Sequence, residues 1–374
     1  MAGIYIHIPF CRKACHYCDF HFSTSLKNVD EVYHAIIKEL SDESRFFENN
    51  KIETLYFGGG TPSVFSAEQL ESIIKTTEKN FNFDRTTAKE ITLEANPDDL
   101  NVSYLKSLKE IGIQRLSIGV QSFDDEILSF LNRSHNSKEA IKSIENAINS
   151  GFKKLNVDFI YGIPGRKPGT IKKELDILEN KEIQHLSMYA LTIEEKTVFG
   201  NWKKKGRLKE KDEDEVVSEY REMKKLLSDW EFEQYEISNF AREGSYAMHN
   251  TNYWLGKKYL GIGPSAHSFD GESRRINPSN NALYINGVKS GTLNRNTELL
   301  SPSNIFNEML MTGLRTKWGV DKFKIQNSEL FPTIKAVLIA YINKGLIIEK
   351  SNAYILSENG KLLADQIASD LFVV

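Results

Sequence analysis

The first half of this 374-residue sequence alternates short runs of β-branched and aromatic residues with longer amphipathic stretches. This order is typical of βα units, in which parallel strands form a sheet that helices cover. We expect six strands, at residues 4–8, 54–57, 90–94, 115–120, 154–161 and 185–190. The helices after them are expected at residues 30–47, 66–80, 102–111, 137–150, 168–179 and 213–230. Right-handed crossovers would curl this sheet into an incomplete (β/α)6 barrel of the TIM type, within the α/β class.

The pattern changes twice after the barrel and divides the chain into three expected domains. Residues 1–231 form the partial barrel. Residues 232–300 lose the βα rhythm, become rich in glycine and aromatic residues, and are expected to close the barrel with strands and loops. Residues 301–374 turn helical, and short apolar runs at 346–349 and 353–356 predict a hairpin, as in a small winged-helix-like module.

The composition is that of an ordinary globular protein, with 40% hydrophobic residues. Lys and Arg total 48 against 51 Asp and Glu, a net charge of -3, so no global basic field predicts a nucleic-acid partner. The N-terminus lacks the basic and apolar regions of a secretory signal, and the longest apolar run, residues 336–342, is too short to cross a bilayer. We therefore expect a cytoplasmic protein, in which cysteines stay reduced.

All three cysteines, Cys11, Cys15 and Cys18, lie together as C-x3-C-x2-C directly after the first expected strand. Three thiolates in one short loop can hold three irons of an iron–sulfur cluster and leave one iron without a protein ligand. An iron of this kind is open to a further ligand, so the motif predicts chemistry as well as structure.

Other uses of the three cysteines fit the chain less well. A disulfide framework needs paired cysteines in a small secreted domain, and here the count is odd in a long chain. A zinc site would need a fourth ligand such as His7 or His16, whereas structural zinc usually takes its ligands from two separated pairs. Inert structural cysteines would be scattered through the core rather than gathered beside Lys13.

A glycine run, Gly58-Gly59-Gly60-Thr61-Pro62, follows the second expected strand and precedes a helix. Its bare backbone would let a ligand approach closely and accept main-chain hydrogen bonds. A phosphate loop is excluded, because the Gly-Lys-Ser/Thr ending is missing and the spacing is not G-x-G-x-x-G. Alone the run marks a tight turn. Beside an open iron it predicts a cradle for the amino and carboxylate groups of an amino-acid-like ligand.

Polar residues gather where the expected strands end, among them Cys11, Glu94, Gln121 and Asp158. Barrel enzymes build their sites from the loops at this end, so one mouth would collect all of them. Glu94 could pair with a cationic amine or cap a helix. Arg133 could bind a carboxylate through two hydrogen bonds or form a surface ion pair. Asp158 interrupts an apolar strand, where a buried carboxylate needs partners or a ligand hydroxyl.

Residues 249–254, H-N-T-N-Y-W, combine an imidazole with two aromatic rings. His249 could ligate a heme iron from a loop while Tyr253 and Trp254 cover the macrocycle. Taken alone, these residues favour a histidine that is packed in the protein with its polar atoms hydrogen-bonded, rather than a heme site.

Four motifs at the first four strands together resemble the radical S-adenosylmethionine (SAM) superfamily: C-x3-C-x2-C, G-G-G-T-P, E-x-N-P and G-V-Q-S-F. Longer matches narrow the resemblance to the branch that contains oxygen-independent coproporphyrinogen III oxidase, among them Y-I-H-I-P-F-C, V-D-F-I-Y-G-I-P-G and G-x-G-P-S-A-H-S. The resemblance spans nearly the whole chain. It implies a radical SAM barrel in which Cys11, Cys15 and Cys18 hold three irons of a [4Fe–4S] cluster, while the amine and carboxylate of SAM chelate the fourth.

The resemblance also implies a set of SAM-binding residues, carried over by motif: Tyr5, Gly59, Gly60, Thr61, Glu94, Gln121, Arg133, Asp158 and Ala190. The glycine backbone and Thr61 would hold the methionine end, Glu94 its amine, and Asp158 a ribose hydroxyl. An electron from the reduced cluster would then cleave the sulfonium to a 5′-deoxyadenosyl radical, so the cofactor supplies the difficult chemistry.

Two departures separate this chain from the oxidase. The oxidase has a further cysteine two residues after the third, where this chain has Phe20, and a long extension before its first strand, where this sequence begins almost at the strand. Both features, with H-N-x-x-Y-W, resemble heme chaperones of the same branch, formerly mistaken for the oxidase. This resemblance implies that His249, Asn250, Tyr253 and Trp254 bind heme, which the protein would pass to an acceptor protein.

We therefore expect a heme chaperone that uses a cluster and SAM. Radical decarboxylation of coproporphyrinogen III, another radical enzyme such as a methyltransferase, and a metal-only interaction module stay open as alternatives, as does whether the chain is an enzyme. The sequence does not name the acceptor or say whether heme is bound covalently and SAM is cleaved. It also leaves open a homodimer and transient contact with membrane-bound acceptors.

Overall fold

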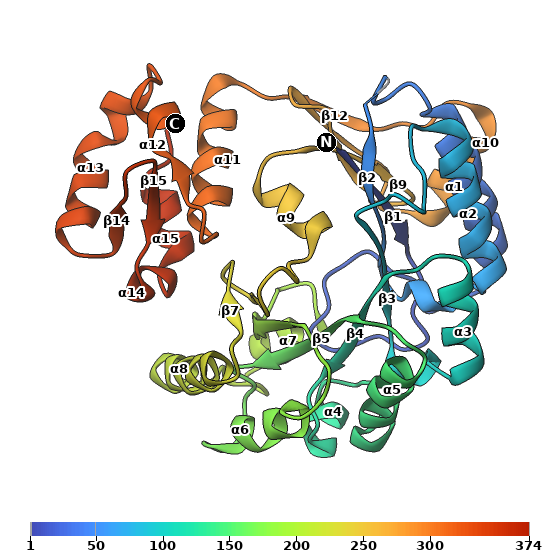
Figure 1. Ribbon diagram of the computed structural model, residues 1–374, viewed down its shortest axis with the longest axis horizontal. Coiled ribbons are helices and arrows are strands. Elements are labelled where there is room, and N and C mark those ends of the chain that lie inside the picture. The colour runs from blue at the N-terminus through green and yellow to red at the C-terminus, as the bar shows by residue number, and fades with distance from the viewer. Residues whose placement is uncertain (1, 49, 374) are drawn as a thin grey trace.

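A computed structural model of the protein describes residues 2–48 and 50–373, so residues 1 and 374, the outer bounds of the expected domains, lie outside it. Its centre is a parallel sheet whose strands follow one another in chain order (Figure 1). These strands are β1 (Ala2–Ile8), β2 (Ile52–Gly59), β3 (Glu90–Ala95), β4 (Arg115–Gln121), β5 (Lys154–Tyr161) and β6 (His185–Ala190). All six expected strands are present, and the incomplete barrel is confirmed.

Helices connect these strands and follow the last of them, most of them on the outer side of the sheet (Figure 1). They are α1 (Val29–Asp42), α2 (Ala67–Asn80), α3 (Val102–Glu110), α4 (Asp125–Phe130), α5 (Ser137–Asn149), α6 (Thr170–Leu175), α7 (Val198–Lys204) and α8 (Glu213–Asp229). Short 3₁₀ turns lie at Pro62–Val64, Pro97–Asp99 and Asp176–Leu178. Capping boxes at Ser66 and Asn136 begin α2 and α5, which explains why their starts could be predicted. The short helices α4 and α7 were not expected.

The first helix ends earlier than predicted, at Asp42 instead of residue 47. Glu43, at its end, forms ion pairs with Arg275 (3.1 Å) and Arg295 (2.8 Å), which lie far along the chain. Phe47 is buried and packs its ring against Phe81, with 6.3 Å between centroids. These contacts come from distant parts of the chain, so the local helical pattern could not reveal the end.

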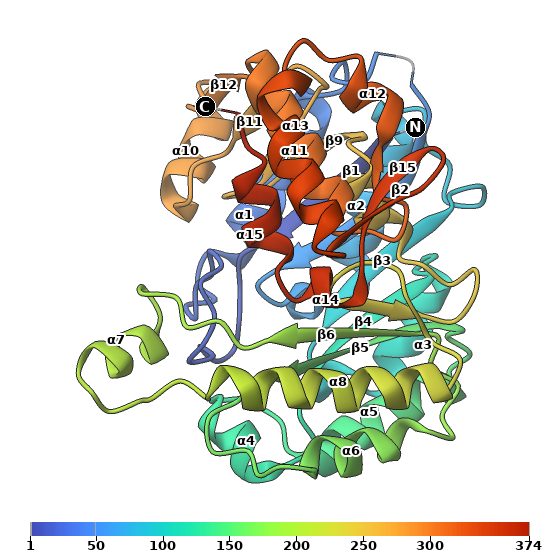
Figure 2. The same cartoon turned by 90° about the vertical axis from the view of Figure 1, so that its left-hand side faces the viewer.

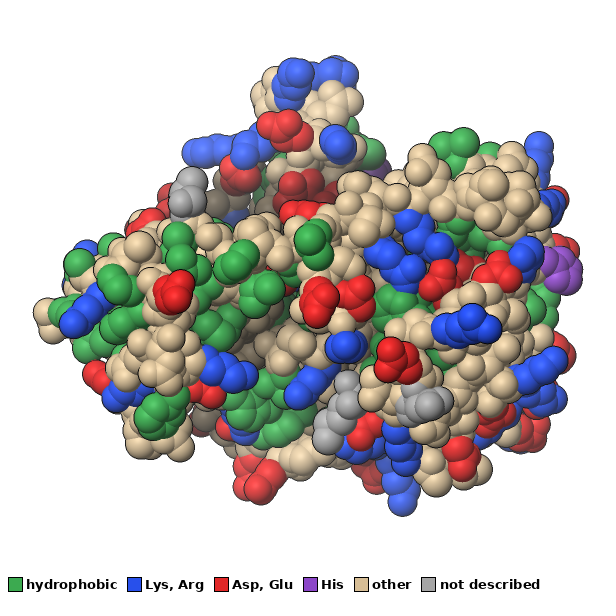
Figure 3. Space-filling view, turned by 90° about the horizontal axis from the view of Figure 1, so that it is seen from above, with side chains coloured by type: hydrophobic (Ala, Val, Ile, Leu, Met, Phe, Trp, Pro, Cys, Tyr) green, Lys and Arg blue, Asp and Glu red, His purple; other side chains and the backbone are tan. Residues whose placement is uncertain are grey.

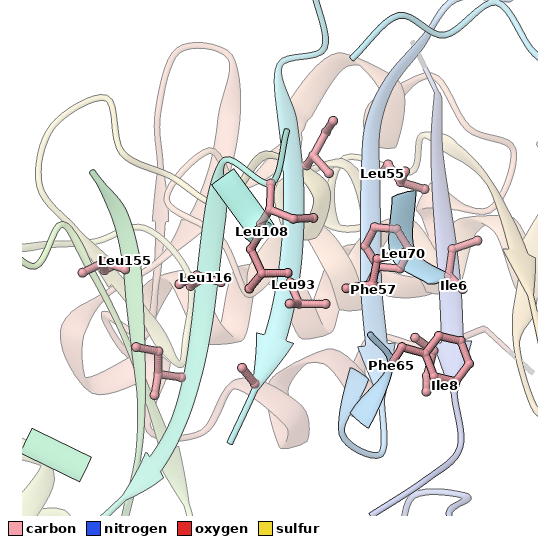
Figure 4. Packing of buried hydrophobic residues seen from close by; sticks show 14 of the residues in the cluster. Ile6, Ile8, Leu55, Phe57, Phe65, Leu70, Leu93, Leu108, Leu116 and Leu155 are labelled. Atoms are coloured by element: carbon pink, nitrogen blue, oxygen red, sulfur yellow. The ribbon is translucent and has the colours of Figure 1, made fainter. Parts of the chain in front are cut away.

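The core lies between the sheet and these helices. Ile6, Phe57, Leu93, Leu116 and Leu155, one from each of five neighbouring strands, are fully buried and lie in one layer (Figure 4). The sequence of a strand that is covered on both faces is a nearly continuous run of apolar residues, and these strands have such sequences. Each such side chain contributes about 1.5–3 kcal/mol by leaving water.

The segment after α8 adds strands to both edges of the sheet. β7 (Glu233–Gln234) and β8 (Asn239–Ala241) lie beside β6, whereas β9 (Lys258–Ile262) pairs in parallel with β1. Beyond β9 lie β10 (His267–Phe269), β11 (Ser273–Ile276) and β12 (Asn296–Leu299), with α10 (Asn281–Ser290) between the last two. In the described part of the chain, the hydrogen-bonded order runs from β12 to β7 without closing on itself.

The H-N-T-N-Y-W segment was expected in a loop, but it forms a helix, α9 (Met248–Trp254). The preceding residue, Ala247, offers no side-chain cap. Glu90 of β3 supplies the cap instead, since its carboxylate accepts the backbone N–H groups of Met248 and His249 (both 3.0 Å). Arg115 of β4 neutralises this buried carboxylate at 2.9 Å. A helix capped by a residue so far away in sequence carries no local start signal.

The C-terminal residues pack around a hydrophobic cluster of their own. They form α11 (Pro302–Leu314), β13 (Val320–Asp321), α12 (Lys322–Gln326), α13 (Phe331–Asn343), β14 (Ile347–Glu349), β15 (Ala353–Leu356), α14 (Glu358–Lys361) and α15 (Ala364–Asp370). β14 and β15 pair antiparallel, which confirms the hairpin. Hydrophobic side chains are frequent on the upper face of this part, at the left of Figure 3. The domain boundaries stay a prediction.

None of the described helices combines the length and apolar composition needed to span a bilayer.

We predict that Glu90→Gln destabilises the protein by about 3 kcal/mol, because it leaves Arg115 charged and buried without a counter-ion. Urea unfolding followed by circular dichroism measures the change. The control is Asp42→Asn, which removes an exposed ion pair with Lys38 (2.7 Å) and should cost less than about 1 kcal/mol. Equal effects of the two variants would contradict the role assigned to Glu90.

Candidate functional site

The carboxyl ends of the parallel strands open into one cavity of about 570 Å³. Figure 2 shows the arrowhead of β6 pointing to the side where the loop after β1 and α7 lie. The cavity brings together all three cysteines and every residue expected to bind SAM: Tyr5, Cys11, Cys15, Cys18, Gly59, Gly60, Thr61, Glu94, Gln121, Arg133, Asp158 and Ala190. Their spatial convergence is a finding, whereas their roles as ligands stay predictions.

The three thiols line the cavity, where burial and the neighbouring thiols disfavour the ionisation of Cys11 and Cys18. Thr61 Oγ1 donates to Cys11 Sγ (3.3 Å), and Arg133 Nη1 donates to Cys15 Sγ (3.1 Å). Burial raises the pKa of the Cys18 thiol to about 12, and the nearby Cys15 and Cys11 add to the shift. Thiols that oppose one another's ionisation need strong positive charge to become thiolates, and iron ions supply such charge. The donor set therefore fits an iron–sulfur cluster.

The glycine run meets the cavity as bare backbone because no side chain fits there. Gly59 has φ +118°, and a Cβ on it would lie 2.8 Å from the His7 ring. A Cβ on Gly60 would lie 2.7 Å from the Phe10 carbonyl oxygen and 3.0 Å from Cys11 Sγ. Both positions therefore require glycine, and a ligand can come within reach of the main chain.

Two half-buried carboxyl groups line the cavity, Glu94 and Asp158. Glu94 accepts hydrogen bonds from the Tyr56 hydroxyl (2.7 Å) and the Gly59 backbone N–H (3.2 Å). Burial raises the pKa of Glu94 to about 7, and the charge of Asp158 contributes. Burial likewise raises the pKa of Asp158 to about 6, although Asn156 Nδ2 donates to it at 2.7 Å. Such acids gain a favourable partner when a cationic group binds beside them.

Arg133 links the loop that carries the three cysteines to the ends of the strands. Its Nη1 donates to Cys15 Sγ and to the Tyr17 hydroxyl (3.3 Å), and its Nη2 donates to Asn96 (2.8 Å) and the Gly119 carbonyl (2.7 Å). Its Nε is buried and has no partner among the described residues. A buried donor without a partner is costly, so this end of the guanidinium adds to the unsatisfied polar groups around the cavity.

Gln121 is strained where β4 ends. Its φ is +71°, which costs a residue with a side chain about 1–3 kcal/mol. The register between β4 and β5 shifts between Gly119 and Gln121, so the chain turns and brings Gln121 to the cavity. Strain of this kind is concentrated at functional sites, which agrees with its expected role.

The four residues of the expected heme site do not share one position. Asn250 and Tyr253 line the cavity. His249 is only 2% exposed and lies behind the wall, where Nδ1 is hydrogen-bonded to Thr54 Oγ1 (2.8 Å) and Nε2 to the Tyr253 hydroxyl (2.8 Å). Heme ligation by His249 stays a prediction, and it requires at least one of these bonds to be exchanged.

Trp254 lies at the end of α9, outside the residues that line the cavity. The guanidinium of Arg315, just after α11, lies over its ring at 5.4 Å. Its indole Nε1 is buried and has no partner among the described residues. Trp254 therefore contacts the C-terminal residues, and its expected contact with heme stays a prediction.

The histidines considered for zinc have other partners. The His7 ring is bonded to Tyr5 and to the backbone carbonyl of His21 (3.1 and 3.0 Å), and His16 Nδ1 to the carbonyl of Phe130 (2.9 Å). Among the described residues, no three His, Cys, Asp or Glu side chains are arranged to hold a single metal ion. A [4Fe–4S] cluster takes each thiolate on a different iron and does not need such convergence.

Sequence reasoning missed some residues of the cavity. Tyr17, Asn96 and Tyr189 all line it, and each stands next to or between residues that were singled out. Asn96 belongs to the E-A-N-P motif, which was the available signal. Phe20, where the oxidase has its extra cysteine, also lines the cavity and is 68% exposed.

Comparison with known proteins matches residues 5–178 to the Radical SAM superfamily. The chain is 34% identical to the heme chaperone HemW of Bacillus subtilis (strain 168), over 98% of both chains. It is 32% identical to HemW of Haemophilus influenzae, over 98% of this chain and 96% of that protein. It is also 31% identical to the mitochondrial radical S-adenosyl methionine domain-containing protein 1 of Danio rerio, over 88% and 76% of the two chains.

Among solved structures, the coproporphyrinogen III oxidase HemN of Escherichia coli, a radical SAM enzyme, has the same fold. The TM-score is 0.85 over all of this chain and 90% of that chain, at 23% identity. This likeness supports the barrel and the C-terminal part as one architecture.

We predict that between pH 5 and pH 8 the stability of Glu94→Gln falls less, or rises more, than that of the wild type. The folded protein holds the Glu94 proton more tightly than the unfolded chain does, since its pKa rises from 4.5 to about 7. Glu94 therefore makes stability fall as the pH rises from about 4.5 to about 7, and a glutamine there does not titrate. Urea midpoints at pH 5 and pH 8 measure the difference. The exposed variant Glu110→Gln should keep the wild-type slope, and a wild-type slope in Glu94→Gln would refute the prediction.

Proposed function

Because the chain belongs to the HemW family of the radical SAM superfamily, we propose that it is a heme chaperone that binds heme and transfers it to an acceptor protein. We propose that it uses a [4Fe–4S] cluster and SAM for this purpose. The observation that carries the proposal is the single cavity that unites three cysteines with Asn250 and Tyr253 of the H-N-x-x-Y-W segment.

Cys11, Cys15 and Cys18 would hold three irons of the cluster. No histidine among the described residues lines the cavity, and the chain has no fourth cysteine, so the fourth iron would be left to SAM. When bound and reduced, the cluster supplies the electron for SAM chemistry. The chain binds and orients the ligand and excludes water from it.

The polar groups of the cavity match the parts of SAM. Glu94 would receive the amine, and the guanidinium of Arg133 the carboxylate. Asp158 would accept a hydrogen bond from a ribose hydroxyl, with Asn156 holding the carboxylate in place. Tyr5 and Ala190 would line the remaining wall.

Heme is proposed to bind at the α9 side of the cavity with His249 as the axial ligand. Burial lowers the pKa of His249 to about 4, so its ring is neutral at physiological pH and keeps a lone pair that a metal can take. Asn250 and Tyr253 already face the cavity. The acceptor, a homodimer and contact with membrane-bound acceptors stay predictions, as does a cytoplasmic location.

An anaerobic hemin titration of the cluster-loaded protein, followed by the Soret band, tests the proposal. We expect saturation near one heme per chain in the wild type and a weakened or blue-shifted band in His249→Ala. Weak, unsaturable binding that is equal in both proteins would contradict the proposal, and SAM-dependent decarboxylation of coproporphyrinogen III would then favour the oxidase.

The cluster is tested separately by iron and sulfide analysis after anaerobic reconstitution. We expect about four irons per wild-type chain and loss of the cluster in Cys15→Ala. Asp19→Asn, in the same loop, is the control and should keep the iron content. A stoichiometric zinc ion in place of iron would overturn this part of the proposal.

A further inference from the structure

Both ring nitrogens of His249 are already occupied by hydrogen bonds within the protein. Their partners are Thr54 on β2 and Tyr253 one turn along α9, each at 2.8 Å. Gly3 on β1 makes room for this pair, because a Cβ there would lie 2.6 Å from Thr54 Oγ1 and 3.0 Å from His249 Nδ1. A ring held this tightly has no nitrogen to give to a metal until it leaves its place.

The His249 ring also belongs to an aromatic stack. It lies parallel to Tyr56, with 5.0 Å between centroids and 25° between planes, and to Tyr5, at 6.4 Å and 29°. Tyr5 and Tyr56 stack on each other at 6.0 Å. Aromatic pairs at such distances contribute about 0.5–1.5 kcal/mol beyond the area they bury. The three rings therefore support one another.

The front of this stack is the wall of the proposed SAM site. Tyr5, Tyr56 and Tyr253 line the cavity, and the Tyr56 hydroxyl donates to Glu94 at 2.7 Å. His249 itself does not line the cavity, so it contacts the wall from behind. The hydrogen bond to His249 orients the Tyr253 hydroxyl, and the His249 ring packs against the side of Tyr56 that faces away from the cavity.

We infer that His249 has two mutually exclusive roles: without heme it positions the tyrosines that shape the SAM site, and heme ligation withdraws it from them. Heme and SAM then weaken each other's binding. The inference rests on the proposed function, since it takes His249 as the heme ligand. Coupling of this kind is reciprocal, so each ligand lowers the affinity of the other by the same factor.

The coupling follows from what ligation must break. To reach a heme iron in the cavity, the His249 ring has to leave the stack and give up its bonds to Thr54 and Tyr253. Tyr253 then lacks the partner that orients it, and Tyr56 lacks the ring behind it while it holds Glu94. In the reverse direction, SAM bound against this wall favours the state in which His249 stays in place. Couplings between sites typically amount to about 5–150-fold in affinity.

The experiment measures SAM binding to the cluster-loaded full chain by anaerobic calorimetry, without hemin and with saturating hemin, and hemin binding with and without SAM. We expect hemin to weaken SAM binding at least about fivefold, and SAM to weaken hemin binding by the same factor. Iron content and the Soret band show in each sample that the cluster and the heme are present.

Two matched variants distinguish the loss of His249 positioning from a non-specific effect of a substitution on the protein. Thr54→Val removes one bond that holds His249 in the stack, so we expect weaker SAM binding, tighter hemin binding and a smaller coupling factor. Thr92→Val, on the neighbouring strand, is the control, because the buried Thr92 hydroxyl has no partner among the described residues. It should leave both affinities and the coupling unchanged.

The outcomes distinguish this inference from the proposed function. If hemin binds through His249 but SAM affinity is the same with and without it, the inference is wrong and the chaperone proposal stands. If the Soret band is unaffected by His249→Ala, heme ligation by His249 is refuted and the inference falls with it. Equal factors in both directions that shrink in Thr54→Val alone would support it.

Discussion

The parallel register of β1 to β6 is the constraint on which the rest of the structure depends. It sets Tyr5 opposite Tyr56 and places the carboxyl ends of all six strands at one rim. A shift of β2 by one residue would turn Tyr56 to the other face of the sheet and remove the partner of Glu94. Leu55 and Phe57 prevent such a shift, because it would move them out of the buried core layer toward the cavity face and cost their burial. The chemistry of the rim thus rests on the packing beneath it.

The rim gathers polar groups whose charge or hydrogen-bonding capacity the protein alone does not satisfy. Two carboxyl groups that line the cavity, Glu94 and Asp158, have raised pKa values, and so have the Cys11 and Cys18 thiols, while Arg133 has a donor without a partner. Each cost falls when iron, a cationic amine or a carboxylate binds. Ligands that bind only the folded state also stabilise it, so the proposed cluster and SAM would add to the stability of this protein.

One buried ion pair joins the barrel to the segment that follows it. Glu90 and Arg115 lie on neighbouring strands, and Glu90 caps α9 while Arg115 also donates to the Ser245 carbonyl at 3.0 Å. The cap places His249 against the tyrosine stack, and the far end of the same helix brings Trp254 under Arg315. α9 therefore connects the strand-end cavity, the sheet and the C-terminal residues.

The sequence by itself determined the six strands, most of their helices, the cysteine motif and the residues that meet at the rim. It could do so because strand period and motif spacing are local, and because the motifs resemble those of the radical SAM superfamily, which implied Tyr5, Arg133 and Ala190. The tertiary structure alone decided that residues 248–254 are helical, that His249 lies behind the cavity and that Trp254 faces α11, because the cap of α9 and both hydrogen-bond partners of His249 depend on packing. It also decided the early end of α1 at Glu43. These features depend on side chains that the fold brings together from separate elements, such as Thr54 and Glu90 with His249, and no local pattern records such contacts.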